Sequence, residues 1–261
     1  GVSDAVDAYT KLLIHFDGTD ASTADITATT GQTVSLEGNA CLDTAQKKFG
    51  VSSIYFDGTG DYATVPDHAD WNFGTGDFTI DFWGKDSSPL ETYGYIGQYT
   101  DANNYWEFHT VSSELAKFTV VIGGTTVINA GTGRCSPYAF THVEIGRSGN
   151  NLYLFYNGFL QSTTNVTGIT MPDLTGALEI GATVNHTRFF KGWLDNIRVC
   201  KGVCRHTTTF SPPVKPYFAN GQYVLIGSPR PLKGIKPYVN VGNVTTSTLT
   251  GSVWNGSTWQ T

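Results

Sequence analysis

The sequence is short of charge: Asp, Glu, Lys and Arg make up only 15% of its 261 residues, against a usual quarter. Residues that favour helix surfaces are scarce, whereas threonine is the most frequent residue and 30 glycines are present. Thr, Val, Tyr, Phe and Trp with frequent Gly indicate many short strands and tight turns. The composition therefore argues against a helical bundle, a coiled coil and a doubly wound α/β fold.

Long apolar runs are absent as well. The longest, such as residues 118–122, have the length of a strand and fall far short of a membrane span, so we expect no membrane insertion. The net charge of −6 argues against binding to the phosphates of nucleic acid or to anionic lipid. The chain does not begin with Met, which indicates a processed chain, a tag remnant or an excised fragment.

Cysteines are few, and none of the four lies in the paired CxxC spacing of a zinc site. Cys200 and Cys204 could form a local disulfide across the intervening turn. The alternative is that Cys41, Cys135, Cys200 and Cys204 are four independent, small buried side chains.

Strand-like segments with turn residues between them recur along the chain. Residues 78–83 alternate, which predicts one face with Phe78, Ile80 and Phe82 and a different environment for the residues between them. Residues 148–151 and Asn157-Gly158 are hairpin signals. About a dozen such strands predict an all-β fold, an antiparallel two-sheet sandwich. The only helical turn that we expect is at residues 45–49.

A proline-rich stretch at residues 211–216 indicates the end of a domain. We predict a first domain at 1–213 and a small β appendix at 214–261. The appendix has strand-like runs, and Asn255-Gly256 predicts a terminal hairpin. A core of this size is small for an independent domain, so the appendix is expected to pack on the sandwich, to join a neighbouring chain or to begin a truncated module. The strand-like runs are residues 222–226, 238–241 and 251–254.

An ordered series of short motifs covers about four fifths of the chain. These are residues 11–18, 48–50, 53–62, 71–83, 142, 147–154, 156–158, 192–198, 201–203 and 210–213. The series resembles the laminin-G-like, concanavalin A-like lectin/glucanase jelly-roll domains, of the type found in bacteriophage virion and tail proteins. The sequence departs from the pattern at Gly84, Cys200 and Cys204. The resemblance implies a jelly-roll sandwich, a virion or extracellular location, and other virion or surface-assembly subunits as partners.

Signs of catalysis are missing. Glycoside hydrolysis needs two carboxylates on one face, and hydrolases similar to this family carry Glu-x-Asp-x-x-Glu on one strand, which this chain lacks. Glu107 and Glu144 appear isolated in the sequence. There is no Gly-x-Ser-x-Gly motif, no phosphate-binding loop and no dinucleotide glycine motif. We expect no enzymatic activity.

Calcium is the cofactor that we expect, because the resemblance implies a structural calcium in some members. Calcium takes six to eight oxygen ligands, often from loops, and Asp17, Asp57, Asp61 and Asp195 lie beside turns at strand ends. We select Asp17 and Asp195, because the resemblance implies that the first and last strands lie side by side. The alternative is that Asp before Gly simply forms a turn.

A dense cluster of aromatic and amide residues lies between Glu91 and Trp106. Sugar rings stack on aromatic faces while amides and carboxylates bind their hydroxyls, so the cluster predicts a carbohydrate site borne mostly on loops. The alternative is that several of these aromatic residues cover the core, as we expect for Trp83 and Trp193; we expect His142 to be buried. The predicted site comprises Tyr95, Tyr99, Asn103, Asn104, Tyr105 and Trp106, with Tyr93 beside it.

The sequence therefore predicts a non-enzymatic binding or structural module. The resemblance implies a virion-associated protein, as part of a tail, a fibre or a capsid decoration, with glycan or cell-surface polysaccharide as its ligand. The alternative function is a secreted glycan-active enzyme, either a glycoside hydrolase or a lyase, or its carbohydrate-binding module. A lectin and a purely architectural subunit are not separated by the sequence.

Overall fold

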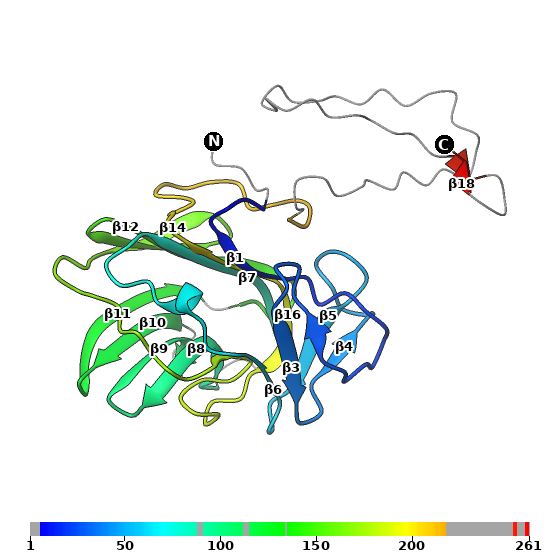
Figure 1. Ribbon diagram of the computed structural model, residues 1–261, viewed down its shortest axis with the longest axis horizontal. Coiled ribbons are helices and arrows are strands. Elements are labelled where there is room, and N and C mark those ends of the chain that lie inside the picture. Colours follow the sequence, from blue (N-terminus) through cyan, green and yellow to red (C-terminus); the bar gives the residue numbers. More distant parts are fainter. Residues whose placement is uncertain are drawn as a thin grey trace. The chain divides into compact units, whose positions relative to one another are not determined.

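A computed structural model describes residues 6–87, 91–111, 115–133 and 135–217, and the short strands at 253–254 and 259–260. The chain forms two compact units, Gly1–Gln222 and Tyr223–Thr261. The first unit contains two antiparallel sheets that face each other (Figure 1). The all-β, two-sheet prediction is confirmed.

The first sheet has eight strands, all paired antiparallel. Its central strand, β16, pairs with β7 along one side and with β5 and then β1 along the other. The first and last strands of the sandwich are thus neighbours, as the resemblance implied. In spatial order the strands are β14 (Phe159–Asn165), β13 (Asn151–Tyr156), β12 (Thr141–Ser148), β7 (Phe78–Asp86), β16 (Lys191–Lys201), β5 (Ser53–Asp57) and β4 (Cys41–Asp43), with β1 (Thr10–Ile14) beside β16.

The second sheet also has eight antiparallel strands. One of them, β8, occupies a segment that the sequence predicted to be a loop. In spatial order the strands are β11 (Thr125–Gly133), β10 (Leu115–Ile122), β9 (Asn104–Val111), β8 (Gly94–Asp101), β15 (Leu178–Ile180), β6 (Tyr62–Val65), β3 (Thr33–Glu37) and β2 (Ile26–Thr27).

The second unit is described only at β17 (Val253–Trp254) and β18 (Trp259–Gln260), which pair antiparallel. This pairing confirms the predicted terminal hairpin. The strand-like runs predicted at 222–226 and 238–241 lie outside the described residues.

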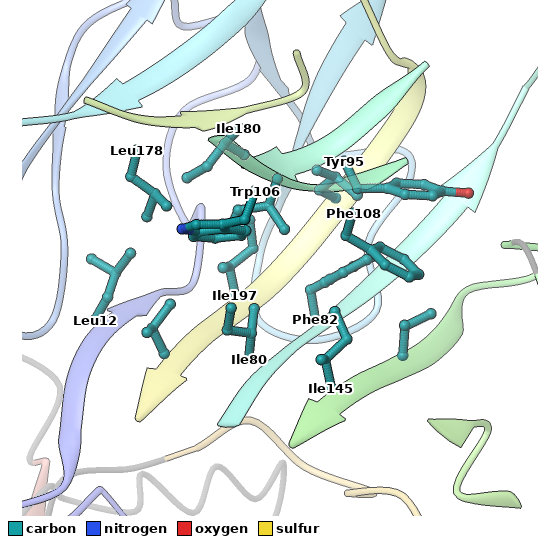
Figure 2. Close-up of a cluster of buried hydrophobic side chains, with 14 of the residues drawn as sticks. Leu12, Ile80, Phe82, Tyr95, Trp106, Phe108, Ile145, Leu178, Ile180 and Ile197 are labelled. Atoms are coloured by element: carbon teal, nitrogen blue, oxygen red, sulfur yellow. The ribbon is translucent and has the colours of Figure 1, made fainter. Parts of the chain in front are cut away.

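The core lies between the two sheets (Figure 2). From the first sheet, Ile80 and Phe82 of β7 point into it, as their alternation predicted. From the second sheet, Tyr95 and Trp106 do so. Burial of such side chains is worth about 1.5–3 kcal/mol each, so this layer is the main source of stability.

The far side of β7 is buried too. Thr79 and Asp81 are inaccessible to solvent, because the segment after β16 covers them. Arg205 donates its backbone N–H to the Thr79 hydroxyl, and the Tyr217 hydroxyl donates to Asp81 over 2.7 Å. Tyr217 lies beyond the predicted boundary at 213 and is itself buried, so the first unit extends at least that far.

Two glycines lie at positions where a larger residue would be disfavoured. Gly158 follows Asn157 in the β13–β14 turn, and both have positive φ (76° and 48°), which Gly and Asn tolerate best. Gly84, a departure from the family pattern, lies against the buried thiol of Cys135. A Cβ at this position would be 2.5 Å from the Cys135 sulfur.

The helical turn expected at 45–49 is not formed. The one helix among the described residues is the 3-10 turn η1 (Ala69–Trp71), and so none of the described helical structure could span a membrane. Residues 48–52 instead turn their backbone N–H groups toward Asp17 and Asp195. These two carboxylates satisfy donors that a helix would otherwise have used.

Candidate functional site on the outer face of the second sheet

The predicted carbohydrate site is divided between two sides of the second sheet. Its residues lie on β8 and β9 rather than on loops, and neighbouring strand residues point to opposite sides. Tyr95 and Trp106 are fully buried in the core (Figure 2). The adjacent Tyr93 is buried there too. These three aromatic residues cannot stack on a sugar, and this part of the prediction is wrong.

Tyr99 and Tyr105 face the other way. They oppose each other in register on β8 and β9, and their ring centroids are 6.0 Å apart. Both are half-buried, which leaves part of each ring accessible. Burial and the nearby Glu107 raise the pKa of Tyr105, so its hydroxyl stays protonated. The two rings form one aromatic surface on the outer face.

Asn103 and Asn104 lie at the β8–β9 turn, beside this tyrosine pair. The Asp101 carboxylate accepts from the Asn103 backbone N–H at 2.7 Å and from the Asn104 amide at 3.1 Å. The Asn104 side-chain oxygen accepts from the N–H of Gly123. The Asn104 side chain therefore stabilises the turn, whereas the Asn103 side chain is exposed to solvent.

Two carboxylates share the outer face with the tyrosines. Glu107 on β9 and Glu179 on β15 both pair in register with Gly97 on β8, so they flank it on one side of the sheet. Because Gly97 has no side chain, nothing on β8 separates them. Sequence reasoning called Glu107 isolated, and the structure corrects this. We call Glu107, Glu179, Thr183, His186 and Arg188 the outer-face cluster.

Glu107 is almost fully buried at 1% exposure, and both of its oxygens are bound. The Thr183 hydroxyl donates to one oxygen at 2.7 Å, and the Arg188 guanidinium donates to the other. Arg188 also contacts a ring nitrogen of His109, at 3.1 Å. Burial lowers the pKa of His109, so this imidazole is neutral around pH 7. Glu107 thus ties two positions of the loop after β15 to the sheet.

Glu179 is the opposite case. Its side chain is 7% exposed, and one oxygen lies 3.4 Å from the Nε2 of His186, while the other has no hydrogen-bond partner. Burial and the neighbouring Glu107 raise its pKa to about 7, although the Asn185 backbone N–H lowers it. Burial also lowers the pKa of His186, whose ring stacks on Tyr62 with centroids 3.9 Å apart.

The loop that covers Glu179 is strained. Val184, Asn185 and His186 have φ values of 53°, 55° and 58°, the left-handed region that residues other than Gly rarely occupy. Each such residue costs on the order of 1–3 kcal/mol, most of all a β-branched one. Outliers of this kind concentrate at functional sites, so they mark this turn as a candidate.

Glu144, the other carboxylate that was considered, lies elsewhere. It is buried on β12 in the first sheet, where its oxygens lie 3.0–3.1 Å from the Nδ1 of His206. It has no part in the outer-face cluster. His142 is buried as predicted, and so is Trp83, while Trp193 is half-buried and donates to Asp43.

The calcium prediction rests on two aspartates that both contact residues 48–52. The Asp195 carboxylate accepts from the N–H groups of Lys48 and Phe49 and from the side-chain amide of Asn196. Asp17 accepts from the backbone of residues 51 and 52. Burial raises the pKa of Asp195 to about 7. These N–H donors do not fit a calcium site, which needs oxygen ligands on every side.

The other two aspartates shape turns. Asp57 accepts from the backbone N–H of Thr59 at 2.7 Å, and Asp61 accepts from the N–H groups of Asn39 and Asp57. Among the residues that the structure describes, no group of three or more His, Cys, Asp or Glu side chains is placed to hold a metal ion. Calcium binding stays a prediction without support from these contacts.

All four cysteines have free thiols. The local Cys200–Cys204 bridge is not formed, because each sulfur is engaged separately. The Cys200 sulfur accepts from Arg205, and the Cys204 thiol donates to the carbonyl of His206. Cys41 and Cys204 are half-buried and the other two are buried, so the alternative of four independent side chains applies.

Comparison with known families and structures supports the fold. A family model described as the concanavalin A-like lectin/glucanases superfamily matches residues 57–207. A comparison with curated proteins found no match.

Solved structures of similar fold include binding domains of botulinum neurotoxins. The receptor-binding domain of botulinum neurotoxin C/D mosaic serotype is 14% identical with a TM-score of 0.58, over 77% of this chain and 50% of that one. The binding domain of botulinum neurotoxin DC, in complex with SialylT, is 16% identical (TM-score 0.56) over 75% and 49% of the two chains. The chain thus spans about half of the toxin domains.

A third structure is matched over nearly its full length. It is domain 4 of a GH43 extracellular arabinanase from Geobacillus stearothermophilus, in complex with arabinotriose. The identity is 12% and the TM-score 0.57, over 76% of this chain and 95% of that one. At such low identity these likenesses show the shared fold and no shared ligand.

Proposed function

Since the chain belongs to the concanavalin A-like lectin/glucanase superfamily, we propose that it is a non-enzymatic binding module whose ligand is a glycan. The observation that carries this proposal is the pair Tyr99 and Tyr105, two partly accessible rings side by side on the outer face of the second sheet. Aromatic faces bind the apolar face of a sugar ring, and polar groups beside them bind its hydroxyls. Asn103 and the outer-face cluster supply such groups.

The neighbours in fold support a binding role in general terms. One was solved with an oligosaccharide and another with SialylT. A domain of a glycan-degrading enzyme has the same fold. The alternative of a carbohydrate-binding module that belongs to an enzyme would therefore also be a non-catalytic binding domain.

The enzymatic alternative would need a pair of carboxylates that reach the substrate, and Glu107 with Glu179 is the pair that flanks one strand. Both oxygens of Glu107 are already bound by Thr183 and Arg188. Glu107 is also almost fully buried, so a glycosidic bond cannot reach it in this arrangement. We therefore propose that the pair is not catalytic.

The proposal includes a place on an extracellular or virion surface, as part of a phage tail, fibre or capsid decoration, with other assembly subunits as partners. The sequence motifs that resemble phage domains carry this part. An edge of the first sheet adds support, because among the described residues no second strand pairs with β14, which presents Phe159 (63% exposed) and Leu160. Unpaired strand edges readily pair with other chains.

A glycan array tests the binding proposal. We expect wild-type protein to bind one group of glycans and Tyr105→Ala to bind them about tenfold more weakly, because one stacking ring is worth roughly 1 kcal/mol or more. Tyr138→Ala is the matched control, since that tyrosine is 91% exposed and lies outside the site. No binding across the array, or equal losses for both variants, would contradict the proposal.

A further inference from the structure

We propose that Glu179 is the polar centre of a binding site for a neutral, hydroxyl-bearing ligand such as a sugar ring, and that the turn at residues 184–187 is its lid. This inference rests on the proposed glycan binding, and it adds the residue, the ligand chemistry and the moving part. Three observations on the described residues carry it.

The first observation is a carboxyl oxygen without a partner. The Glu179 side chain is more than nine-tenths buried, and one of its oxygens makes no hydrogen bond. A buried polar atom without a hydrogen-bond partner costs free energy. Glu179 lies between Leu178 and Ile180, which both face the core, so its side chain is on the outer face. A ligand hydroxyl on that face would satisfy the oxygen.

The second observation is that both ends of the turn are anchored. Thr183 precedes it and Arg188 follows it, and both bind Glu107. Thr183 also packs on β8 where two glycines make room: a Cβ on Gly94 or Gly97 would lie within 3.0 Å of Thr183 side-chain atoms. The segment can thus move between fixed ends without loosening the sheet.

The third observation is the strain between these anchors. Val184, Asn185 and His186 all have positive φ, and His186 stacks on Tyr62 above Glu179. The Nε2 of His186 is 3.4 Å from Glu179, and the Asn185 backbone N–H also bonds this carboxyl group, so the lid is closed over the group that it covers. Opening would release strain and expose the carboxyl group.

The charges around Glu179 favour a neutral ligand. Glu107 on β9 flanks Glu179 across Gly97, and Arg188 and His109 lie beside Glu107. From the loop, the Asn185 N–H and His186 contact Glu179. Tyr62 on β6 and its strand partner Glu37 on β3 complete the surroundings. Glu107 is ion-paired with Arg188, and His109 and His186 are neutral around pH 7 because burial lowers the pKa of each imidazole. The one guanidinium of the outer-face cluster is therefore already paired and is not left to bind an anionic ligand. A hydroxyl donates to an ionised carboxyl group and accepts from a protonated one.

The test uses the full chain and four neutral trisaccharides: arabinotriose, cellotriose, maltotriose and tri-N-acetylchitotriose. For any that bind, we expect wild-type affinity to rise at least fivefold from pH 5.5 to pH 8.5, because a hydroxyl bonds more strongly to an ionised carboxylate. The isosteric variant Glu179→Gln should bind more weakly at pH 8.5 and show no such pH dependence. Glu91→Gln, which changes an exposed carboxylate just before β8, is the matched control and should keep the wild-type profile.

Hydrogen–deuterium exchange tests the lid. Saturating trisaccharide should change the exchange of amides 184–188 in the wild-type protein and leave it unchanged in Glu179→Gln at the same ligand concentration. Affinity that rises on lowering salt, with tighter binding of triglucosamine than of tri-N-acetylchitotriose at pH 6.5, would overturn the neutral-ligand assignment.

The outcomes also separate the two proposals. If Tyr105→Ala abolishes binding while Glu179→Gln leaves affinity and pH profile intact, this inference is wrong and the proposed function stands. If no trisaccharide and no glycan on the array binds, both are wrong.

Discussion

The outer faces of both sheets bury carboxylates, and Asp81 on the first sheet and Glu179 on the second are treated in opposite ways. On the first sheet, Asp81 accepts from the Arg198 guanidinium on one oxygen at 2.8 Å and from the Tyr217 hydroxyl on the other. On the second sheet, Glu179 has no cation of its own and leaves one oxygen unbound. Both side chains are removed from water, so burial alone does not explain the difference.

The pKa values record the contrast. Burial would raise the pKa of Asp81, but the charge of Arg198 and the contact with His142 outweigh it and lower the pKa to about 2. Burial raises the pKa of Glu179 to about 7, and the charge of Glu107 adds to the effect. A buried carboxylate that is paired with a cation has both oxygens occupied within the fold. One without a cation can keep an oxygen that is able to accept another hydrogen bond.

The largest effect that we expect comes from removing the cation on the first sheet. Arg198→Met leaves Asp81 buried without its cation and removes the guanidinium that lies 3.7 Å from the Tyr217 ring centroid. We expect a loss of about 3–5 kcal/mol in the free energy of unfolding, measured by urea denaturation at pH 7.

Two further variants show whether the unpaired charge is the cause. Lys191→Met changes an exposed cation of the same strand and should cost less than about 0.5 kcal/mol. Adding Asp81→Asn to Arg198→Met should recover part of the loss in a double-mutant cycle. A loss below about 1 kcal/mol for Arg198→Met would show that Asp81 is satisfied without the arginine.

The second prediction concerns the opposite pH dependence of the two faces. The stability from Asp81 is present above its ordinary pKa of 3.8 and is lost as the pH falls toward 2. The raised pKa of Glu179 has the reverse sign: the folded state holds its proton more tightly, so stability is highest below pH 4.5 and falls as the pH rises to about 7.

Glu179→Gln isolates the second effect. At pH 8 the variant should be more stable than the wild type by up to about 3 kcal/mol, and at pH 4 the two should be equal within about 0.5 kcal/mol. Urea midpoints across this pH range measure the difference. A constant difference from pH 4 to pH 8 would mean that the Glu179 carboxyl group ionises freely in the folded protein.

The smallest effect tests the strain beside Glu179. Val184→Gly should raise the free energy of unfolding by about 1 kcal/mol, because Gly adopts positive φ without cost and this gain exceeds its own loss of chain entropy. Val51→Gly, at an exposed position with ordinary φ, should lower stability or leave it unchanged. Thermal unfolding compares them, and equal destabilisation by both would show that Val184 is not strained.

The strands that the sequence predicted are those with regular alternation and clear turns. Phe78, Ile80 and Phe82 form a core row as their period of two indicated, and Asn157-Gly158 turns β13 into β14. These features depend on neighbours in the chain, so a single sequence contains them. The all-β sandwich could be predicted for the same reason.

The candidate site could not be predicted from local sequence patterns in this way. The register shift between Gly94 and Ile96 on β8 breaks the alternation, and Tyr95 enters the core although the residues around it resemble a binding loop. Glu107 and Glu179 meet only because β15 pairs with β8 at Gly97. In the sequence, each of these glutamates is a single acidic residue between two apolar ones. This pattern indicates that the side chain lies on the outer face, but it does not indicate which residue lies beside it.

The pairing of β1 with β16 has a consequence for how the protein is made. Thr10 and Cys200 are partners across the first sheet although 190 positions separate them in the chain. During synthesis, the apolar strand Leu12–Ile14 leaves the ribosome long before the strand that will cover its edge exists. Such distant pairing slows folding, to the millisecond-to-second range in small β-proteins. The sandwich therefore closes only after translation of almost the whole first unit, and until then β1 is open to association with other nascent chains.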